Sequence, residues 1–168
     1  MENQDSAGGI IECQIAGLPA GIGEPVFDKL DALLAHAVLS IGAVKGFEIG
    51  DGFEAARSNG STNNDAFCLK DGQITKKTNH SGGTLGGMSD GSTVIFRAAI
   101  KPTPSISSLQ QTVNSSMEEV DISVKGRHDP IIVPRAVVVV ESMAALTTVD
   151  LLLRNMSASM DHLLRIYR

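Results

Sequence analysis

The sequence predicts an α+β fold in which antiparallel strands pack on long apolar helices. Two observations lead to this prediction. Short β-favouring runs flank a helical repeat near the N-terminus, which gives a β–α–β start. The longest apolar segment continues from Pro134 to Leu153, which is too long for a strand. Since 168 residues suffice for one domain with a real core, we expect residues 1–168 to form a single domain.

The first element is a strand over residues 8–16, a short β-favouring run, followed by a glycine-rich loop over residues 17–23. A helix is expected from Glu24-Pro25 to residues 40–42, since proline is tolerated in the first helical turn. A second strand follows over residues 43–49. The helix is predicted by apolar residues at helical spacing, namely Val26, Phe27, Leu30, Leu33, Leu34, Ala37 and Val38.

The middle of the chain predicts mostly irregular structure and strands. Residues 51–78 hold no long periodic segment, so we expect an extended functional loop with a short turn or strand near Phe67–Leu69. A strand is expected over residues 92–100, whose alternate residues from Val94 to Ile100 are apolar. Residues 109–114 and 118–124 predict a hairpin.

The C-terminal part predicts two helices. Pro134 begins a long one that continues through Leu153 and is apolar around most of its circumference, so we expect deep burial. The β-branched run Val137–Val140 would also suit a buried strand, but the apolar pattern is longer than a strand. A shorter helix is expected over residues 157–168.

Composition excludes several classes of protein. A net charge of −5 and a pI of about 5.3 argue against nucleic-acid binding, which needs a basic face. The run from Ile131 to Val140 is interrupted by Pro134-Arg135, so no apolar run is expected to span a bilayer. Residues 1–5 lack the pattern of a signal peptide. Neither the two cysteines nor the four histidines have metal-ligand spacing, which predicts reduced thiols and no metal: Cys13, Cys68, His36, His80, His128 and His162.

Three short segments are suited to close contact between the backbone and a ligand. They are the glycine-dense loop at residues 79–87, the Pro-rich segment at residues 101–105 and the segment at residues 126–130. Glycine pairs permit positive φ angles and remove a Cβ that would keep a ligand away. Lys101 and Arg127 supply cations that suit phosphate or carboxylate.

These segments and several others resemble chorismate synthase, the shikimate-pathway lyase of aromatic amino acid biosynthesis. The resemblance runs from about Asp5 to the C-terminus and covers only the C-terminal half of that family. The family's N-terminal half carries an Arg-rich segment and a histidine that have no match here, so we expect a fragment of a longer protein. The matching stretches are residues 21–30, 43–50, 64–67, 79–87, 101–105, 126–130 and 134–137.

The resemblance implies a 1,4-anti elimination of phosphate from 5-enolpyruvylshikimate 3-phosphate, giving chorismate, with reduced FMN as the cofactor and no metal. It also implies a β–α–β sandwich fold, a homotetramer, a cytoplasmic location and a link to NADP. The partner expected is a small phosphorylated substrate, not nucleic acid or a membrane. The alternative is a non-catalytic flavin- or anion-binding fragment that lacks the N-terminal catalytic half.

The resemblance also implies which residues contact FMN. Some of them have a structural alternative: Gly86 can be a tight turn, and residues 101–105 can be a strand end with a Pro-rich turn. At Gly42 the family often has Asn, so a side-chain contact is lost there. The implied FMN contacts are Gly42, Ala43, Gly86, Lys101, Pro102, Thr103, Pro104, Ser105 and Arg127.

The implied catalytic residue is Asp129, which lies just before the helix that begins near Pro134. A helix N-terminus favours negative charge, so it helps to keep Asp129 ionised or to attract an anionic ligand. Asp129 would then handle a proton near the flavin. The alternative is a structural ion pair between Arg127 and Asp129. His80 and His128 are weaker candidates, since each can hydrogen-bond loop backbone instead.

Overall fold

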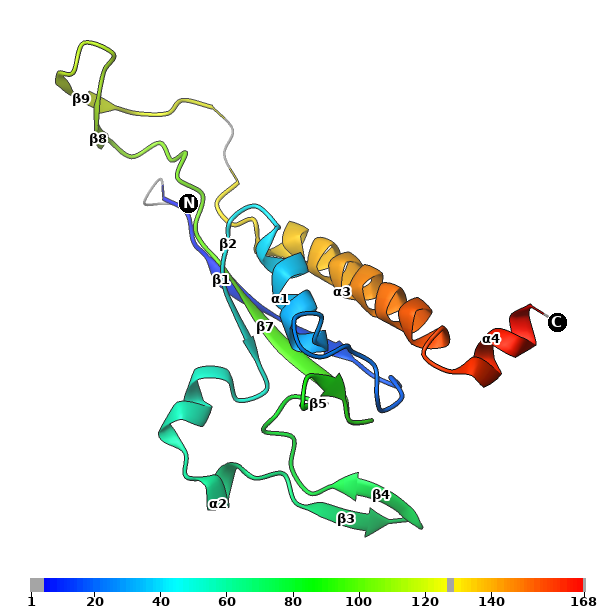
Figure 1. Cartoon of the computed structure of the whole chain (residues 1–168). Helices are drawn as coiled ribbons and strands as arrows, with labels where there is room; N and C mark the ends of the chain where they lie inside the picture. The colour runs from blue at the N-terminus through cyan, green and yellow to red at the C-terminus, as the bar shows by residue number, and fades with distance from the viewer. Residues whose placement is uncertain (1–4, 127–128, 168) are drawn as a thin grey trace.

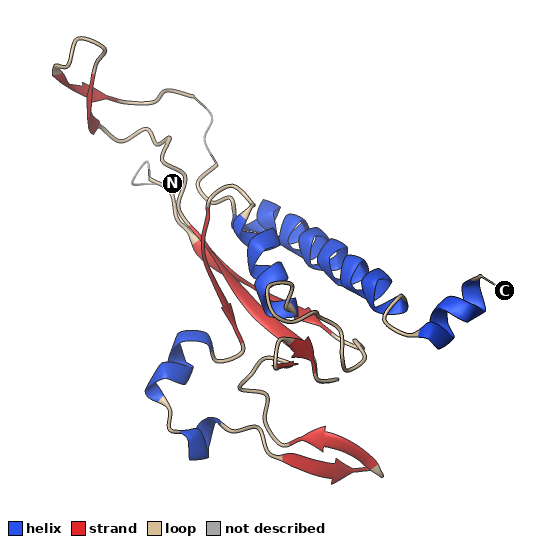
Figure 2. Ribbon diagram, in the orientation of Figure 1, coloured by secondary structure: helices blue, strands red, loops and turns tan. Residues whose placement is uncertain are grey.

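The computed structural model describes residues 5–126 and 129–167. Its centre is a three-stranded antiparallel sheet in the order β1-β7-β2, with β1 at Gly9–Ile15, β7 at Val94–Ile100 and β2 at Val44–Ile49. Helices α1 (Leu30–Leu39) and α3 (Val133–Met156) lie together along this sheet (Figure 1). The predicted α+β class is confirmed: one sheet layer is covered by one helix layer (Figure 2).

The predicted β–α–β start is confirmed, with β7 inserted between its two strands. Gly9 pairs with Ile100 at one end of β7, and Ile15 pairs with Val94 at the other. β2 pairs with the opposite edge of β7, with an irregularity between Val44 and Gly46. β1 and β2 therefore run parallel to each other, and both have β7 as their partner.

The core lies on one face of β7, as its alternating sequence predicts. Val94, Phe96, Ala98 and Ile100 are buried, and Phe96 stacks on Phe47 of β2 with 5.2 Å between ring centroids. Residues 95, 97 and 99 point to the opposite, more open face. This two-residue alternation decides which face of the sheet receives the helices.

Helix α1 packs through Leu30, Leu34 and Val38, which are fully buried and spaced four residues apart. The predicted start at Glu24-Pro25 is wrong, because the helix begins at Leu30. The amide of Leu30 donates a hydrogen bond to the Gly87 carbonyl at 2.8 Å. The glycine-dense loop of residues 79–87 therefore contacts the first amide of the helix. Lys29 before it is extended, with ψ of 147°.

Helix α3 confirms the helical interpretation of the run Val137–Val140, but the expected deep burial is wrong. Its buried positions form one stripe, namely Val140, Ala144, Thr148 and Leu151. Other apolar side chains are solvent-exposed, including Val138 at 60% and Leu146 at 66%.

The expectation that no apolar segment is long enough to span a bilayer is also wrong for α3. By length and composition, its 24 residues could cross one. That observation is weak, because the core helix of a soluble protein satisfies the same criteria. In this structure α3 packs its buried stripe on α1 and β1.

The segment expected to be an extended loop contains short elements. The strand expected near Phe67–Leu69 is β3 (Phe67–Lys70), which forms a hairpin with β4 (Gln73–Lys76). Asp71 and Gly72 turn this hairpin with φ of 53° and 76°, as the favoured two-residue Asp-Gly turn requires. A 3₁₀ helix (Gly52–Arg57) and a one-turn helix α2 (Gly60–Asn63) precede it.

The glycine-dense loop contains a second small hairpin of β5 (Thr84–Leu85) and β6 (Met88–Ser89), which the sequence did not predict. The hairpin predicted for residues 109–114 and 118–124 is confirmed as β8 (Gln110–Val113) and β9 (Glu119–Ile122). The final helix is confirmed as α4 (Met160–Ile166), shorter than expected.

The stripe on α3 predicts a position-dependent loss of stability. Val140→Ala should lower the free energy of unfolding by about 2 kcal/mol, because it removes fully buried methyl groups and leaves a cavity. Val138→Ala on the exposed side of the same helix should change it by less than about 0.5 kcal/mol. Denaturant unfolding of both variants is the measurement. Equal losses would show that the helix docks through a different face.

Candidate functional site

Two of the predicted cofactor segments meet at one end of the sheet. The Lys101 amide donates a hydrogen bond to the Ala43 carbonyl at 2.9 Å. This contact continues the strand pairing, since Ile100 pairs with both Gly9 and Val44. The sheet register therefore places Ala43 beside Lys101, at the start of the segment of residues 101–105.

Ala43 has a strained backbone at this point. Its φ is 70°, in the left-handed region that a residue with a side chain seldom adopts. Such a residue costs about 1–3 kcal/mol and persists only when its surroundings hold it in place. Here the carbonyl of Ala43 is fixed by Lys101. A Cβ at the preceding Gly42 would meet nothing within 4 Å, so space is open on that side.

Thr103 carries an unsatisfied polar atom. Its carbonyl accepts a hydrogen bond from the Ser6 hydroxyl at 2.6 Å, which holds the segment beside the chain that leads into β1. Its own hydroxyl Oγ1 is buried and has no hydrogen-bond partner among the residues that the structure describes. Leaving a buried hydroxyl unpaired costs about 1–3 kcal/mol, so a polar ligand atom here would recover free energy.

Lys101 supplies the positive charge of this site. Its side chain is exposed and forms no ion pair with any residue that the structure describes. Pro102 and Pro104 fix the backbone on either side of Thr103. Ser105 is half-buried and offers a second hydroxyl. One ammonium group and two hydroxyls within five residues suit an anionic phosphate tail.

Asp129 lies at the same end of the sheet. Ala7, just before β1, donates its amide to the Pro130 carbonyl at 2.8 Å and forms a bridge with Ile131. The Asp129 carboxylate pairs with Arg135 of α3, 2.5 Å from its guanidinium. Arg127, the predicted cofactor residue and alternative partner, and His128 lie outside the described residues. The observed pair is largely exposed, so it contributes little to stability.

Gly86 is not brought together with the other predicted residues. It turns the β5–β6 hairpin near the start of β7, whereas Lys101 follows the end of β7. The seven residues of β7 separate these ends by roughly 20 Å. A Cβ at Gly86 would meet nothing within 4 Å, so its φ of 61° permits a tight turn that faces open space.

Other glycines of this loop serve close packing of backbone on backbone. A Cβ at Gly82 would lie 2.3 Å from the Gly50 nitrogen, and one at Gly83 would lie 2.6 Å from the Thr93 carbonyl oxygen. The amide of Gly50 also donates to the Ile95 carbonyl at 2.9 Å. Much of the glycine density therefore fixes this loop against β7.

A buried ionic cluster that the sequence analysis missed lies under this loop. Lys76 of β4 contacts three groups: the Asp90 carboxylate, the Ser81 hydroxyl at 3.1 Å and the Asp65 carboxylate at 3.7 Å. The charged side chains of Lys76, Asp65 and Asp90 are each only 5–6% exposed. The motif Asn64-Asp65-Ala66-Phe67 was noticed in the sequence, but no spacing rule joins Asp65 to Lys76 and Asp90.

The pKa values of both carboxyl groups reflect this cluster. Burial by itself raises the pKa of Asp65. Hydrogen bonds from the amides of Ser81 and His80 and the hydroxyls of Thr78 and Ser81 outweigh burial, and they hold the pKa well below its usual range. At Asp90, burial also raises the pKa, but Lys76 and the Ser92 amide lower it overall.

The same loop carries a histidine–carboxylate pair. Nδ1 of His80 lies 2.6 Å from Oδ2 of Asp51, and the side-chain amide of Asn63 donates a hydrogen bond to the same oxygen at 3.3 Å. Both side chains of the pair are about one-third exposed. The backbone amide of His80 also donates to the Asp65 carboxylate, so His80 helps to hold the loop. Its ring contacts the Asp51 carboxylate and not the loop backbone that the alternative interpretation expected.

Neither the ionic cluster nor the histidine pair supplies a metal site. No group of three or more His, Cys, Asp or Glu residues is positioned to hold a metal ion in the described part of the chain. Cys13 and Cys68 are free thiols. Burial, followed by the charge of Glu141, raises the pKa of the Cys13 thiol, which keeps it in the unreactive protonated form.

The ionic cluster predicts a pH-dependent role for Asp65. Asp65→Asn should lower the free energy of unfolding by about 3 kcal/mol at pH 7, because it breaks a buried ion-pair network. Because the folded-state pKa is depressed, this contribution is present above the ordinary pKa near 4 and is lost as the pH falls toward the folded value. Denaturation of wild type and variant between pH 7 and pH 3 should show the difference shrinking below about pH 4.

The matched control is Asp121→Asn on β9, where the carboxylate is exposed. It should leave stability within about 0.5 kcal/mol at every pH. A constant difference between wild type and Asp65→Asn down to pH 3 would contradict the charge-based explanation.

Comparisons with known proteins agree with the motifs at this site. A family model for chorismate synthase matches residues 1–153. A chorismate synthase of Agathobacter rectalis is 66% identical over 168 residues, which make up all of this chain and 46% of that protein. One of Archaeoglobus fulgidus is 63% identical over 150 residues, which make up 89% of this chain and 42% of that protein.

The fold agrees as well. A crystal structure of chorismate synthase matches with a TM-score of 0.75 and 33% sequence identity, over 93% of this chain and 40% of that one. The chain spans somewhat less than half the length of the curated relatives it matches. Because the family model covers most of the sequence and the motifs are those of its C-terminal half, this protein belongs to the chorismate synthase family.

Proposed function

We propose that this chain forms the cofactor-binding half of a chorismate synthase-type lyase. The reaction would be the 1,4-anti elimination of phosphate from 5-enolpyruvylshikimate 3-phosphate to give chorismate, with reduced FMN as the cofactor. One observation supports the proposal: Gly42–Ala43, Lys101–Ser105 and Asp129 lie at the same end of the sheet, where the buried Thr103 hydroxyl has no partner among the described residues. Family membership makes this arrangement specific.

The residues present fit the phosphate end of FMN. The Lys101 ammonium would pair with the phosphate, and the hydroxyls of Thr103 and Ser105 would donate hydrogen bonds to it. The open space beside Gly42 and the strained Ala43 backbone would admit a flat group close to the chain. When bound, reduced FMN supplies electron density transiently as the phosphate leaves, with no net redox change.

Asp129 would handle a proton beside the cofactor. Its carboxylate lies just before α3, whose N-terminus favours negative charge. The Arg135 guanidinium, 2.5 Å away, orients this carboxylate. Arg127 would add a second cation toward the anionic ligands, a role that rests on the family motif. Gly86 would contribute only where a ligand or another chain reaches the opposite end of β7.

The second candidate function, for the 168-residue chain taken by itself, is a non-catalytic flavin- or anion-binding fragment. The chain spans only 46% of the Agathobacter rectalis relative. Its sequence has no match to the Arg-rich segment and histidine of the family's N-terminal half. We further propose a cytoplasmic homo-oligomer, a tetramer when full-length, that acts on a small phosphorylated substrate and has no nucleic-acid or membrane partner. The link to NADP remains part of this proposal.

The two candidates are separated by a chimera. In it, this chain replaces the matching 46% of the Agathobacter rectalis relative. We expect the chimera to release phosphate from 5-enolpyruvylshikimate 3-phosphate with reduced FMN under anaerobic conditions, and the isolated chain to release none. A folded, FMN-binding chimera without phosphate release would support the non-catalytic candidate. Normal turnover by the isolated chain would contradict the need for a second half.

Thr103 tests the cofactor site itself. In the chimera, Thr103→Val should weaken FMN binding about tenfold, because one hydrogen bond to a charged group is lost. Without FMN, the same variant should be as stable as wild type or slightly more stable, since the hydroxyl has no partner to lose among the described residues. Titration of FMN and thermal unfolding without ligand measure the two effects.

The matched control for this variant is Thr112→Val on exposed β8, which should leave FMN affinity unchanged. If Thr103→Val destabilises the ligand-free protein and leaves FMN affinity unchanged, the hydroxyl is structural and the site lies elsewhere.

A further inference from the structure

The chain that leads into β1, residues 6–9, lies between two segments of the proposed cofactor site. On one side is the segment of residues 101–105, and on the other is the segment of residues 129–131. Both segments form hydrogen bonds with residues 6–9, which we call the leading segment. None of its four residues is among the predicted site residues.

The leading segment contacts the first of these segments through Ser6 and Gly8. The Ser6 hydroxyl donates a hydrogen bond to the Thr103 carbonyl at 2.6 Å. A Cβ at Gly8 would collide with the Ile100 carbonyl oxygen and would lie 3.2 Å from Cδ of Pro102. A side chain at this glycine would therefore push the two strands of chain apart. One hydrogen bond and one close backbone contact together fix the leading segment against the chain around Thr103.

The leading segment contacts the second segment through Ala7 and Gly9. The Ala7 amide donates a hydrogen bond to the Pro130 carbonyl at 2.8 Å, and Ala7 forms a parallel bridge with the residue that follows this proline. A Cβ at Gly9 would lie 3.0 Å from Cγ2 of Val133, the first residue of α3. Asp129 is therefore next to backbone that the leading segment holds in place.

The covalent connection between the two segments does not position them. Between Ser105 and Asp129 the chain passes through the β8–β9 hairpin, which projects beyond the end of the sheet (Figure 1). The strands of this hairpin contact each other, and no other described element packs extensively on them. Because an isolated two-stranded hairpin is marginally stable in water, it cannot set the separation of the segments that it joins.

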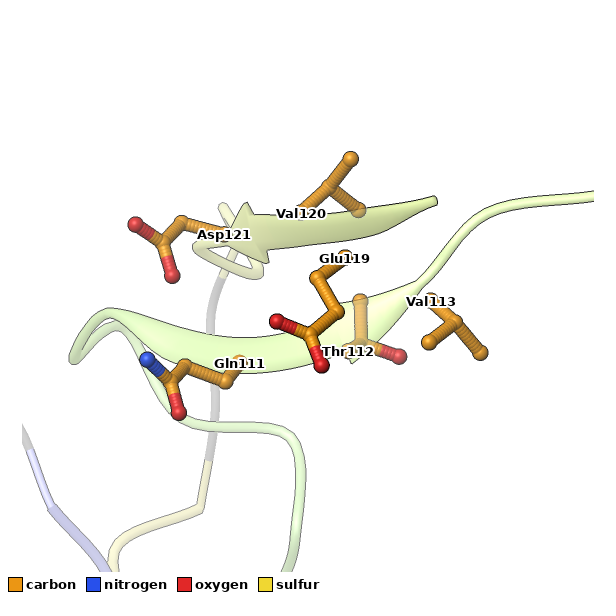
Figure 3. A pocket seen from close by; sticks show the side chains of 6 residues that line it. All are labelled: Gln111, Thr112, Val113, Glu119, Val120 and Asp121. Atoms are coloured by element: carbon orange, nitrogen blue, oxygen red, sulfur yellow. The ribbon is translucent and has the colours of Figure 1, made fainter. Parts of the chain in front are cut away.

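The β8–β9 hairpin also does not offer the anionic cofactor a better place. Its strands border a hollow of about 440 Å³, shown in Figure 3. The residues that line it are Gln111, Thr112, Val113, Glu119, Val120 and Asp121. Two of these are exposed carboxylates and none is Lys or Arg, so the hollow repels an anion.

We propose that the leading segment positions the two parts of the cofactor site and that Ser6 is the positioning residue. Ser6 acts through Thr103, whose carbonyl it holds, and makes no contact with the ligand itself. The adjoining Ala7 amide holds the segment of Asp129. The placement of the Thr103 hydroxyl relative to the Asp129 carboxylate therefore depends on residues 6–9. This inference rests on the proposed function for the identity of the ligand.

Hydrogen exchange of the ligand-free, 168-residue chain tests whether the two contacts are coupled. Ser6→Ala removes the bond to one segment, and it should lower the protection factor of the Ala7 amide, which bonds to the other segment. We expect a change of about fivefold, the effect of one neutral hydrogen bond. Amides of β7 should keep their protection. Ser6→Thr retains a hydroxyl and should restore the protection of Ala7.

Titration of FMN tests the positioning role in the chimera described above. Ser6→Ala should weaken FMN binding about fivefold, and Ser6→Thr should restore it. The matched control is Ser157→Ala, which removes a hydroxyl-to-carbonyl hydrogen bond of 2.8 Å to Arg154 at the far end of α3. This control should change neither the protection factor of Ala7 nor the affinity for FMN.

Gly8→Ala disturbs the same contact in a different way. The added methyl group should push the leading segment away from Ile100 and weaken FMN binding about tenfold. Its matched control is Gly60→Ala, because a Cβ at Gly60 meets nothing within 4 Å. Circular dichroism of each variant checks that it is folded.

Two results would overturn the proposal and leave the proposed function intact, provided that the wild-type chimera binds FMN. One is an unchanged protection factor of Ala7 in Ser6→Ala. The other is a lowered protection factor with wild-type affinity for FMN, because Ser6 would then be a structural contact only. If the wild-type chimera does not bind FMN, the proposed function fails, and the leading segment has no cofactor to position.

Discussion

The antiparallel pairing of β7 with both β1 and β2 is the interaction on which the rest of the structure depends. In the part of the chain that the structure describes, these two pairings make up the main sheet, and α1 and α3 pack along it. The buried side chains of β7, Val94 to Ile100, form the floor on which α1 and α3 pack. Loss of this strand would separate β1 from β2 and leave both helices without a surface to cover.

The two ends of β7 have different chemistry. At its C-terminal end, the chain continues through Lys101 and Thr103 near Ala43 and the segment of Asp129. The Thr103 hydroxyl and the Lys101 ammonium have no partner there among the described residues. At its N-terminal end, charges are buried and fully paired around Lys76. Groups left unpaired suit ligand binding, whereas a satisfied buried network makes its loop rigid. This difference is the reason that the proposed function puts the anionic cofactor at the C-terminal end of β7.

The unequal burial of α3 is consistent with the chain's share of its relatives' length. One stripe, centred on Val140 and Ala144, meets α1 and β1. Apolar residues such as Val138 and Leu146 face solvent, where a monomeric protein rarely keeps so many. The curated relatives contain more than half of their length outside the matched region. A helix that is apolar on most sides is suited to lie between two layers, and one of these layers is the β1-β7-β2 sheet.

Local sequence determined much of this protein by itself. Alternation along β7 and four-residue spacing in α1 are short-range patterns, and the structure confirms both. The motifs at residues 79–87, 101–105 and 126–130, together with four further matching stretches, identified the family. The start of α1 could not be predicted, because the amide of Leu30 is held by the Gly87 carbonyl, a contact across 57 positions of the chain. The Asp71-Gly72 turn carried a local signal for a hairpin that the sequence analysis did not use.

Tertiary structure alone decided which groups meet. Lys76 joins Asp65 and Asp90, and Lys101 reaches Ala43, because the sheet register brings these segments together. The same register separates Gly86 from the other predicted cofactor residues by the length of β7. Periodicity reports which side of an element is apolar, but it contains no information about which distant segment covers that side. That choice depends on pairing between strands remote in sequence, which is why the polar cluster and the division of the predicted site were visible only in the folded chain.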